Sequence, residues 1–396
     1  MVTREQKKII LKNVLELIEL PPSAYEKAKK RYDDLGEWFG RDESIVKNND
    51  PHVFPQGSFR LGTAIRPLDE KEEYDLDLAC KLREGISRNS HTQEKLKDLV
   101  GHEIESYREA RGIETPKEEK HRCWRLEYQD DLNFHMDIVP CIPADSAKQA
   151  IILESMRKAG ESESIAGIAS ELTVSITDDR HHGYRTICDD WNISNPEGYA
   201  KWFEVRMNQS ARIAFLEKAQ VDDVPLYRKK ALLQRAIQFL KRHRDQMFKD
   251  DNDVKPISII ITTLAARAYQ GESDVESALS NILATMGGLV NQSRPRVPNP
   301  VDPAEDFADR WSMPEYTHLK LEQNFWNWLK QAQTDFSLLG SEEDVGFIAE
   351  QAYKKFSIGL NTSELVKRLG LTAPSILVTP KAHSISAPAK PWKSNL

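Results

Sequence analysis

The sequence predicts an α+β protein in which a lobe built on a β-sheet precedes a lobe of helices. Residues 74–82 and 132–139 alternate apolar and polar side chains, which is typical of strands with one buried face. From Pro196 onwards, most of the chain instead places apolar residues at helical spacing. The change of pattern near residue 195 therefore predicts two lobes of different secondary structure.

The domain organisation follows from this change. We predict a core with N-terminal helices over residues 1–195, a helical lobe over residues 196–379 and a flexible tail over residues 380–396. The tail is rich in Pro, Ser, Ala and Lys, a composition typical of mobile segments. With 396 residues, 39% of them hydrophobic and 30% charged, the chain is long enough for two or three lobes with substantial cores.

The composition also excludes several classes of protein. The N-terminus MVTREQKKII is charged, and the longest apolar runs are too short to span a bilayer, so we expect a cytoplasmic protein with no membrane contact. Four cysteines are spread without a C-x-x-C pair, which favours reduced thiols over a zinc ribbon or disulfides. A net charge of −7 argues against a protein that coats long nucleic acid.

The elements can be placed in chain order. Besides the two strands above, a third is expected at residues 121–129, joined to the next by a tight turn at Asp130-Asp131. Residues 145–195 are polar and weakly periodic, and we interpret them as an insertion or linker. The Pro-rich residues 294–303 predict an extended connector. Helices are expected at about 3–20, 23–38, 92–111, 197–219, 226–248, 257–270, 273–287, 316–335 and 342–357.

Three aspartates give the strongest chemical signal. Asp75 and Asp77 lie on the polar face of the first strand, opposite Leu76 and Leu78, and Asp137 lies on the polar face of a later strand. A D-x-D pair on the exposed face of an edge strand is common without any function. Carboxylates that lie close together, however, repel one another unless a cation lies between them, and oxygen ligands suit Mg²⁺ or Mn²⁺.

A second signal precedes the first strand. In Gln56-Gly57-Ser58, the glycine allows the backbone to approach an anion closely, and the serine hydroxyl can donate to a phosphate oxygen. The combination of a Gly-Ser turn, a D-x-D strand and a later strand aspartate resembles the layout of the polymerase-β type nucleotidyltransferases. We therefore interpret the segment as a phosphate cradle.

A third signal is the basic segment 227–244, which concentrates seven Lys and Arg residues in an acidic chain. Such runs are often solvated helix faces. The functional interpretation is a triphosphate clamp in which Lys241 supplies an ammonium group and Ser258 supplies a hydroxyl. Ser258 lies where a helix is expected to begin, and a helix N-terminus favours anions.

A paired histidine offers a further metal hypothesis. His181 and His182 stand beside Asp178 and Asp179 in a polar segment. Accidental clusters of this kind are frequent in loops, and no partner at a fixed spacing accompanies them. We favour a surface loop here.

The resemblance narrows when longer motifs are compared. From about residue 50 to residue 315 the chain resembles the bacterial cGAS/DncV-like nucleotidyltransferases, which make cyclic oligonucleotide messengers in the anti-phage defence system CBASS. That resemblance implies a bilobal polymerase-β-like core joined to a helical domain like that of oligoadenylate synthases. The motifs that carry it are QGSFRLGTAIRP, EYDLDLAC, HMDIVP, NPEGYAKWF, AIQFLKRHRD, PISIIITTLAARAY and NPVDPAEDFADRW.

The resemblance implies a role for each candidate site residue. Asp75, Asp77 and Asp137 are expected to be the catalytic acids and to ligate two Mg²⁺ ions, with Mn²⁺ as a possible replacement. The nucleotide contacts implied by position are Gln56, Gly57 and Ser58 at the donor phosphates, Lys241 and Ser258 at the triphosphate tail, and Asp306 near the nucleotide pocket.

The function that the resemblance implies is the synthesis of a purine cyclic dinucleotide, such as cGAMP, from ATP, GTP or both. Two alternatives remain open, namely transfer of a nucleotide to an RNA, protein or small-molecule acceptor, and a silent nucleotide-binding protein. Expected partners are the nucleotides and operon-encoded ubiquitin-like transfer or regulatory proteins, while a downstream effector would be reached through the product alone. Because no Cys/His run matches the zinc insert of the animal DNA sensors, we expect no activation by DNA.

Overall fold

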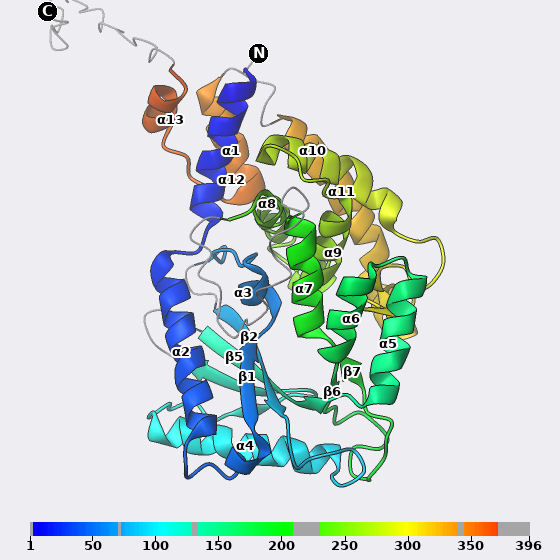
Figure 1. The fold of residues 1–396 in the computed structure, drawn as a ribbon. Coiled ribbons are helices and arrows are strands. Elements are labelled where there is room, and N and C mark those ends of the chain that lie inside the picture. The colour runs from blue at the N-terminus through cyan, green and yellow to red at the C-terminus, as the bar shows by residue number, and fades with distance from the viewer. Residues whose placement is uncertain (1–2, 70–72, 129–133, 209–229, 339–343, 371–396) are drawn as a thin grey trace, which may run out of the picture.

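The computed structural model describes residues 3–69, 73–128, 134–208, 230–338 and 344–370. A mixed β-sheet lies at one end of the molecule and a group of helices at the other, so the predicted α+β fold is confirmed (Figure 1). No helix within these ranges combines the length and the apolar character that crossing a bilayer requires.

Most of the helices agree with the apolar periodicity, but those at 57–61 and 362–368 were not predicted, and the segment 145–195 is discussed below. The helices are α1 (Arg4–Ile18), α2 (Pro22–Gly40), α3 (Gly57–Leu61), α4 (Gln93–Ala110), α5 (Ser146–Lys158), α6 (Glu163–Glu171), α7 (Pro196–Met207), α8 (Leu232–Met247), α9 (Ser258–Ala268), α10 (Val275–Thr285), α11 (Leu321–Leu338), α12 (Val345–Phe356) and α13 (Thr362–Arg368). Several begin with a capping side chain: Thr3 forms a capping box with Gln6, and the side chain of Thr92 accepts from the Lys95 amide.

The main sheet has seven strands. They are β1 (Pro51–Pro55), β2 (Tyr74–Leu82), β3 (Glu118–Glu119), β4 (Trp124–Tyr128), β5 (Phe134–Pro143), β6 (Val174–Ile176) and β7 (Ile193–Ser194). The order β1-β2-β5-β4-β3 is continued by β6, which pairs with the second half of β5, and by β7, which pairs with β6. Only the β2–β5 pair is parallel, and every other pair in this sheet is antiparallel.

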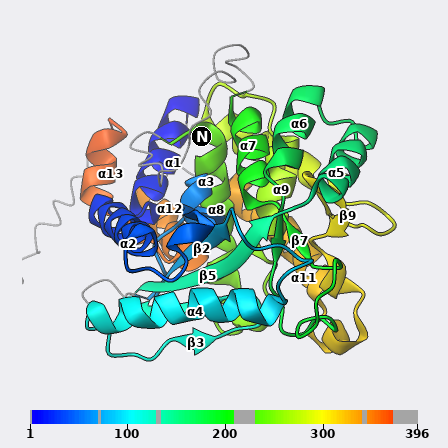
Figure 2. The ribbon, with the colours of Figure 1, turned by 60° about the horizontal axis from the view of Figure 1, so that its bottom comes forward.

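One face of the sheet is covered by helices. The apolar side chains of β2, including Leu76 and Leu78, pack with Val100 and Ile104 of α4 in a buried cluster that also contains α2. Figure 2 shows α4 running across this face. The alternation predicted for residues 74–82 is therefore confirmed, and the acidic positions of β2 lie on the opposite face.

A second apolar cluster joins the helices. It contains residues of α7 to α12, and it also takes in Val14 and Ile18 of α1 together with residues of α5 and α6. The first helix therefore packs with the helical group, next to α8 and α10, although it precedes the sheet in the chain. The lobe boundary at residue 195 stays a prediction.

The interpretation of residues 145–195 as an insertion or linker is wrong. This segment forms α5 and α6, and β6 and β7 then extend the sheet. Helix α5 buries only Ile152 and Met156, so its apolar stripe is faint, and β6 has three residues, all buried and without alternation. The side chains of Asp145 and Ser162 cap α5 and α6, and these caps were the available signal.

The Pro-rich residues 294–303 were expected to form an extended connector, but the chain bends over residues 292–297 and then forms a small hairpin. Strand β8 (Pro298–Asn299) pairs with β9 (Asp302–Asp306). Of the segment 226–248 predicted as a helix, the described part begins α8 at Leu232. Residues 209–229 and 371–396, including the predicted tail, lie outside the described residues.

The close packing of α4 on β4 yields a stability prediction. A Cβ atom at Gly101 would lie 2.6 Å from the ring of Trp124, so Gly101→Ala should lower the free energy of unfolding. Overpacking costs about 1–3 kcal/mol and the better helix propensity of Ala returns about 1 kcal/mol, which leaves a loss of up to about 2 kcal/mol. Urea unfolding measures the change in the free energy of unfolding. Gly36→Ala in α2 is the matched control, since nothing lies within 4 Å of its Cβ, and it should stabilise. Equal shifts for both variants would contradict the packing argument.

Candidate functional site

The parallel pairing of β2 with β5 brings the predicted acids together. Asp77 lies opposite Asp137 in the register, and Asp75 lies opposite His135. Directly opposed residues on neighbouring strands point to the same face of the sheet, so all four side chains share the face that α4 does not cover. Two acids from β2 and one from β5 therefore meet, as the alternation of the sequence predicted.

Helix α3 reaches this acidic face through its first residue. The amide of Gln56 donates to the Asp77 carbonyl at 2.8 Å, which joins the start of α3 to β2. Gly57 has φ of 62°, and a Cβ there would overlap Oδ2 of Asp77. Glycine is thus required twice, for its positive φ and for the space that the carboxylate fills. The Gly-Ser turn and the D-x-D strand form one structural unit.

The crowding of negative charge changes the pKa values of the acids. Burial, together with the charges of Asp75 and Asp137, raises the pKa of Asp77 to about 7. Burial also acts to raise the pKa of Asp75, but the hydrogen bond and charge of His135 outweigh it and leave that pKa below its usual value. Three oxygen-donor acids with an excess of negative charge fit a divalent cation such as Mg²⁺.

Cationic side chains stand on either side of the acids. Arg125 of β4 donates from Nε and Nη2 to the two oxygens of Asp137, both at 2.7 Å. The Nε2 atom of His135 contacts Asp75, and its Nδ1 lies 3.0 Å from Glu73. Sequence reasoning assigned no role to Arg125 or His135. The alternation of W-R-L-E-Y could have placed Arg125 on the acid face, but its partner depends on the β4–β5 register.

A cavity of about 870 Å³ opens in front of this face. Residues from both halves of the chain line it, among them Gly57, Ser58, Asp75, Asp77, His135, Lys241, Arg244 and Ser258. The cavity therefore has an acidic wall from the sheet and a basic wall from the start of α9 and the end of α8. An anionic ligand with bound cations would meet charges of both required signs.

The basic wall is held by hydrogen bonds. Ser258 is the first residue of α9, and its hydroxyl accepts from Nη1 of Arg244 at 2.8 Å. Nζ of Lys241 donates to the Thr63 carbonyl at 3.0 Å. Burial, with the charge of Arg244, lowers the pKa of Lys241 to about 8. Arg244 was not among the predicted nucleotide contacts, although it lies in the predicted basic segment.

Helix α8 contacts the chain after α3 through a row of side chains, which we call the α8 carbonyl row. Gln234, Gln238, Lys241 and Arg242 donate in order to the carbonyls of Leu61, Ala64, Thr63 and Arg66. These donors recur at helical spacing along one side of α8. This part of the basic segment is therefore buried and bound to main-chain oxygens, so it is not a solvated helix face.

Three predicted site residues do not line this cavity within the described chain. Gln56 caps α3, and its side chain donates to the Leu78 carbonyl at 3.2 Å. Asp137 lies behind the lining residues in its pair with Arg125. Asp306 accepts from the amides of Arg296, Val297 and Ala308, so its carboxylate fastens the loop around β9.

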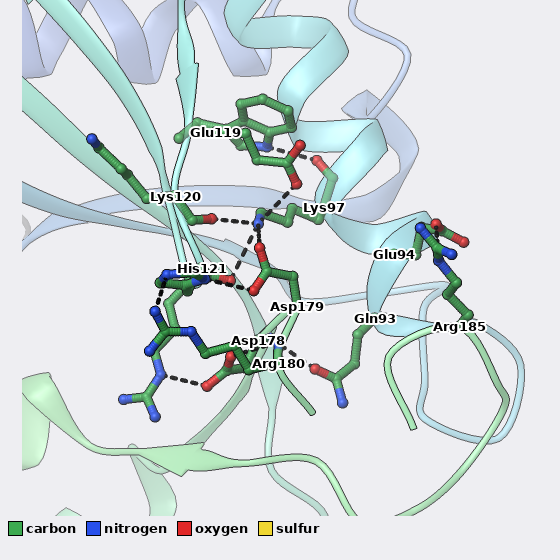
Figure 3. Close-up of polar contacts among 12 residues, drawn as sticks. Gln93, Glu94, Lys97, Glu119, Lys120, His121, Asp178, Asp179, Arg180 and Arg185 are labelled. Atoms are coloured by element: carbon green, nitrogen blue, oxygen red, sulfur yellow. Dashed lines mark hydrogen bonds and ion pairs between the residues drawn. The ribbon is translucent and has the colours of Figure 1, made fainter. Parts of the chain in front are cut away.

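The paired histidines lie in a segment that is tied to the sheet lobe. Figure 3 shows the buried ammonium group of Lys97 beside Asp179, Glu119 and the Lys120 carbonyl, while Asp178 accepts from Arg122. His181, His182 and Asp190 lie close enough together to form a possible ligand group. However, Nδ1 of His181 accepts from the Gly183 amide at 3.0 Å, which places the proton on Nε2, the nitrogen that faces Asp190. The surface-loop interpretation accounts for these contacts.

Comparison with known proteins agrees with this geometry. Residues 51–141 match the family model described as the nucleotidyltransferase domain of cyclic GMP-AMP synthase DncV-like proteins. The chain is 29% identical over 404 residues to a c-di-GMP synthase of Roseivirga ehrenbergii, covering 96% of this chain and 95% of that protein. It is 25% identical to the cyclic dinucleotide synthase CdnG of Bradyrhizobium diazoefficiens, covering 93% and 87% of the two chains.

Solved structures agree at the level of the fold. The structure of Bradyrhizobium diazoefficiens CdnG in complex with GTP gives a TM-score of 0.62 at 22% identity, over 91% of this chain and 97% of that chain. Vibrio cholerae DncV in complex with ATP, GTP and 5MTHFGLU2 gives 0.53 at 17% identity, over 91% and 87%. The fold is the polymerase-β-like nucleotidyltransferase fold of these structures. Residues 51–141 match a DncV-like nucleotidyltransferase domain, and almost the whole chain is similar to bacterial cyclic dinucleotide synthases.

The contact between Gly57 and Asp77 yields a prediction about activity. Gly57→Ala should lower kcat by about a hundredfold, because displacing Asp77 or α3 by about 1 Å spoils the geometry of the site. The rate of nucleotide incorporation measures it. Gly112→Ala is a matched control, since Gly112 has nearly the same φ of 63° but nothing within 4 Å of its Cβ. Both variants should lose about 1–2 kcal/mol of stability through the positive φ, and Gly57→Ala should lose more because of the overlap with Asp77. If Gly112→Ala lost as much activity, strain alone would explain the effect.

The raised pKa of Asp77 yields a prediction about stability. The native state keeps a proton on Asp77 up to about pH 7, whereas the unfolded chain loses it near pH 3.8, so stability falls as the pH rises between these values. Asp77→Asn removes this loss. In EDTA at pH 8, the unfolding free energy of Asp77→Asn should exceed that of wild type by roughly 1–3 kcal/mol, and its melting temperature should be higher. The difference in unfolding free energy should become smaller towards pH 5.

The control for this pH trend is Asp34→Asn. The hydrogen bond from Arg111 lowers the pKa of Asp34, so its contribution to stability is present above the unfolded pKa and is lost at lower pH. Asp34→Asn should therefore destabilise the protein at pH 8. An Asp77→Asn variant that melts below wild type at pH 8 would contradict the charge-crowding argument.

Proposed function

We propose that the chain is a metal-dependent nucleotidyltransferase that joins two purine nucleotides into a cyclic dinucleotide for anti-phage defence signalling. The observation that carries this proposal is the β2–β5 register, which brings Asp75, Asp77 and Asp137 to one face of the sheet, beside a cavity with a basic opposite wall. The names of the similar proteins, c-di-GMP synthase and cyclic dinucleotide synthase, support the same product class.

The acids would hold the metal. Asp75, Asp77 and Asp137 are the proposed ligands for two divalent cations, Mg²⁺ by their oxygen chemistry and Mn²⁺ as a possible replacement. Bound there, the cations would lower the pKa of the attacking ribose hydroxyl and neutralise charge on the leaving pyrophosphate. His135 and Glu73 keep Asp75 oriented at the edge of the cavity. Gly57 leaves room for the carboxylate of Asp77.

The remaining groups would bind the triphosphate. Ser58 lies in the first turn of α3 and faces the cavity, where its hydroxyl can donate to a phosphate oxygen. Lys241, Arg244 and Ser258 line the opposite wall and supply positive charge and donors for the triphosphate tail. Gln56 contributes by fixing α3 to β2. Asp306 has a structural role in the loop at β9 in this proposal, and the nucleotide contacts come from the other residues.

The substrates are proposed from the relatives. CdnG is described in complex with GTP, and DncV with ATP and GTP, so we infer that at least one of the joined nucleotides is GTP. The chain reuses one site for both transfers, since the linear product keeps a free ribose hydroxyl for ring closure. A CdnC protein of Escherichia coli is described in complex with a HORMA protein, which supports a regulatory protein partner for this chain as well.

Incubation with labelled NTPs tests the function. Wild type with ATP, GTP, CTP, UTP and Mg²⁺ should form a phosphatase-resistant product without any added acceptor, and mass spectrometry should identify a guanine-containing cyclic dinucleotide. Asp75→Asn with Asp77→Asn should abolish it, because two of the three proposed metal ligands lose their charge. Asp33→Asn, at an aspartate of α2 paired with Lys29, should keep full activity. Label appearing only on an added acceptor, or product from the folded double variant, would refute the proposal.

A further inference from the structure

Arg125 is a charged side chain next to the acids that the proposed function does not use. It lies on β4 directly opposite Asp137, while Asp77 lies opposite Asp137 on the other side. The central acid of the three-strand group therefore has an acid on one side and a guanidinium on the other. Both oxygens of Asp137 accept from Arg125, at 2.7 Å each, in the parallel geometry that only arginine offers.

The influence of Arg125 extends beyond Asp137. Its charge contributes to lowering the pKa of Asp75, after the larger effects of burial and His135. Conversely, the hydrogen bond with Asp137 and the charges of Asp137 and Asp75 raise the pKa of Arg125. Arg125 is therefore a fixed positive charge within the acid group, at every pH at which the protein is folded.

The pair does not lie in the apolar core. The side chains of Arg125 and Asp137 are 26% and 18% exposed, and they point to the sheet face that carries the acids. A bidentate arginine–carboxylate pair at this exposure can contribute to stability. Its position beside the acids also places the guanidinium where a cation bound by Asp137 would meet it.

The geometry sets up a competition. An ionised carboxylate offers about four lone-pair positions, and the two hydrogen bonds from Arg125 use about two of them. A divalent cation on Asp137 must use the remaining positions or displace one hydrogen bond, and the guanidinium repels it in either case. The same two hydrogen bonds fix the carboxylate plane, so the orientation of Asp137 depends on Arg125.

We propose that Arg125 is a positioning residue that orients Asp137 and competes with the divalent cation for its oxygens, which keeps cation binding at this acid weak. The proposal rests on the proposed function, because it assumes that Asp137 is a metal ligand. In the complete site, nucleotide phosphates add negative charge that outweighs the guanidinium, so the cation binds tightly beside Asp137 only when substrate is present.

Binding of Mn²⁺ to the full chain tests this proposal, since free Mn²⁺ is counted by electron paramagnetic resonance without any turnover. Arg125→Gln has a shorter, uncharged side chain, and it should bind Mn²⁺ roughly five- to tenfold more tightly than wild type when nucleotide is absent. Arg125→Lys keeps the charge and should stay within about twofold of wild type. With a non-hydrolysable GTP analogue, the difference between Arg125→Gln and wild type should narrow.

The control is Arg111→Gln in α4's C-cap position. Arg111 donates to both oxygens of Asp34, at 2.8 and 2.7 Å, in the same two-bond geometry but away from Asp75, Asp77 and Asp137. The loss of the Arg111 guanidinium should therefore leave Mn²⁺ binding unchanged. The thermal melting of each variant is measured as well. If Arg125→Gln is unstable, Arg125→Lys still tests the proposal, because a variant that keeps the charge must bind Mn²⁺ like wild type.

Activity gives an independent readout. Arg125→Gln should reach half-maximal rate at a lower Mn²⁺ concentration but with a lower kcat, since Asp137 loses its orientation. A purely structural arginine would change the melting temperature and leave the Mn²⁺ requirement alone. Unchanged or weaker Mn²⁺ binding by folded Arg125→Gln overturns the inference. Wild type that binds no Mn²⁺, with or without the GTP analogue, overturns instead the metal assignment of the proposed function.

Discussion

The parallel pairing of β2 with β5 is the constraint on which the site depends. Because side chains alternate along both strands, a shift of one residue would turn Asp137 into the apolar layer and place Ile138 beside Asp77. The buried residues of β2 and β5, which pack on α4, make that shift unfavourable. The apolar face of the sheet thus fixes the positions of the acids on the other face, and the chemistry of the site is a consequence of how the core is packed.

Charge balance around the acids follows from the neighbouring strands and helices. Three acids on one face would repel one another, and the structure places Arg125, His135 and Lys241 around them on different elements. The burial of Asp77 against Gly57 keeps one acid partly protonated near neutral pH. Positive charges on neighbouring elements therefore offset part of the repulsion between the acids, and Asp77 is left as a carboxylate with a raised pKa.

The sequence was sufficient for those parts of the fold and site that follow from local patterns. Alternation placed Asp75, Asp77 and Asp137 on polar faces, and helical spacing located most helices to within a few residues. Alternation does not specify which strands are neighbours, so the pairing of Arg125 with Asp137 was not predicted. Segments with faint apolar stripes, such as α5, were misread for the same reason: their burial is decided by distant partners. The sequence also did not indicate that the carboxylate of Asp306 binds three backbone amides, because other acids lie close to it in the chain.

The α8 carbonyl row has a consequence for how firmly the two halves of the chain are joined. Four side chains of one helix hold the main chain between Leu61 and Arg66, which follows α3 in the chain. Separating α8 from this segment would break several buried hydrogen bonds at once. Lys241 and the segment after α3 are therefore held together at the cavity that both of them line.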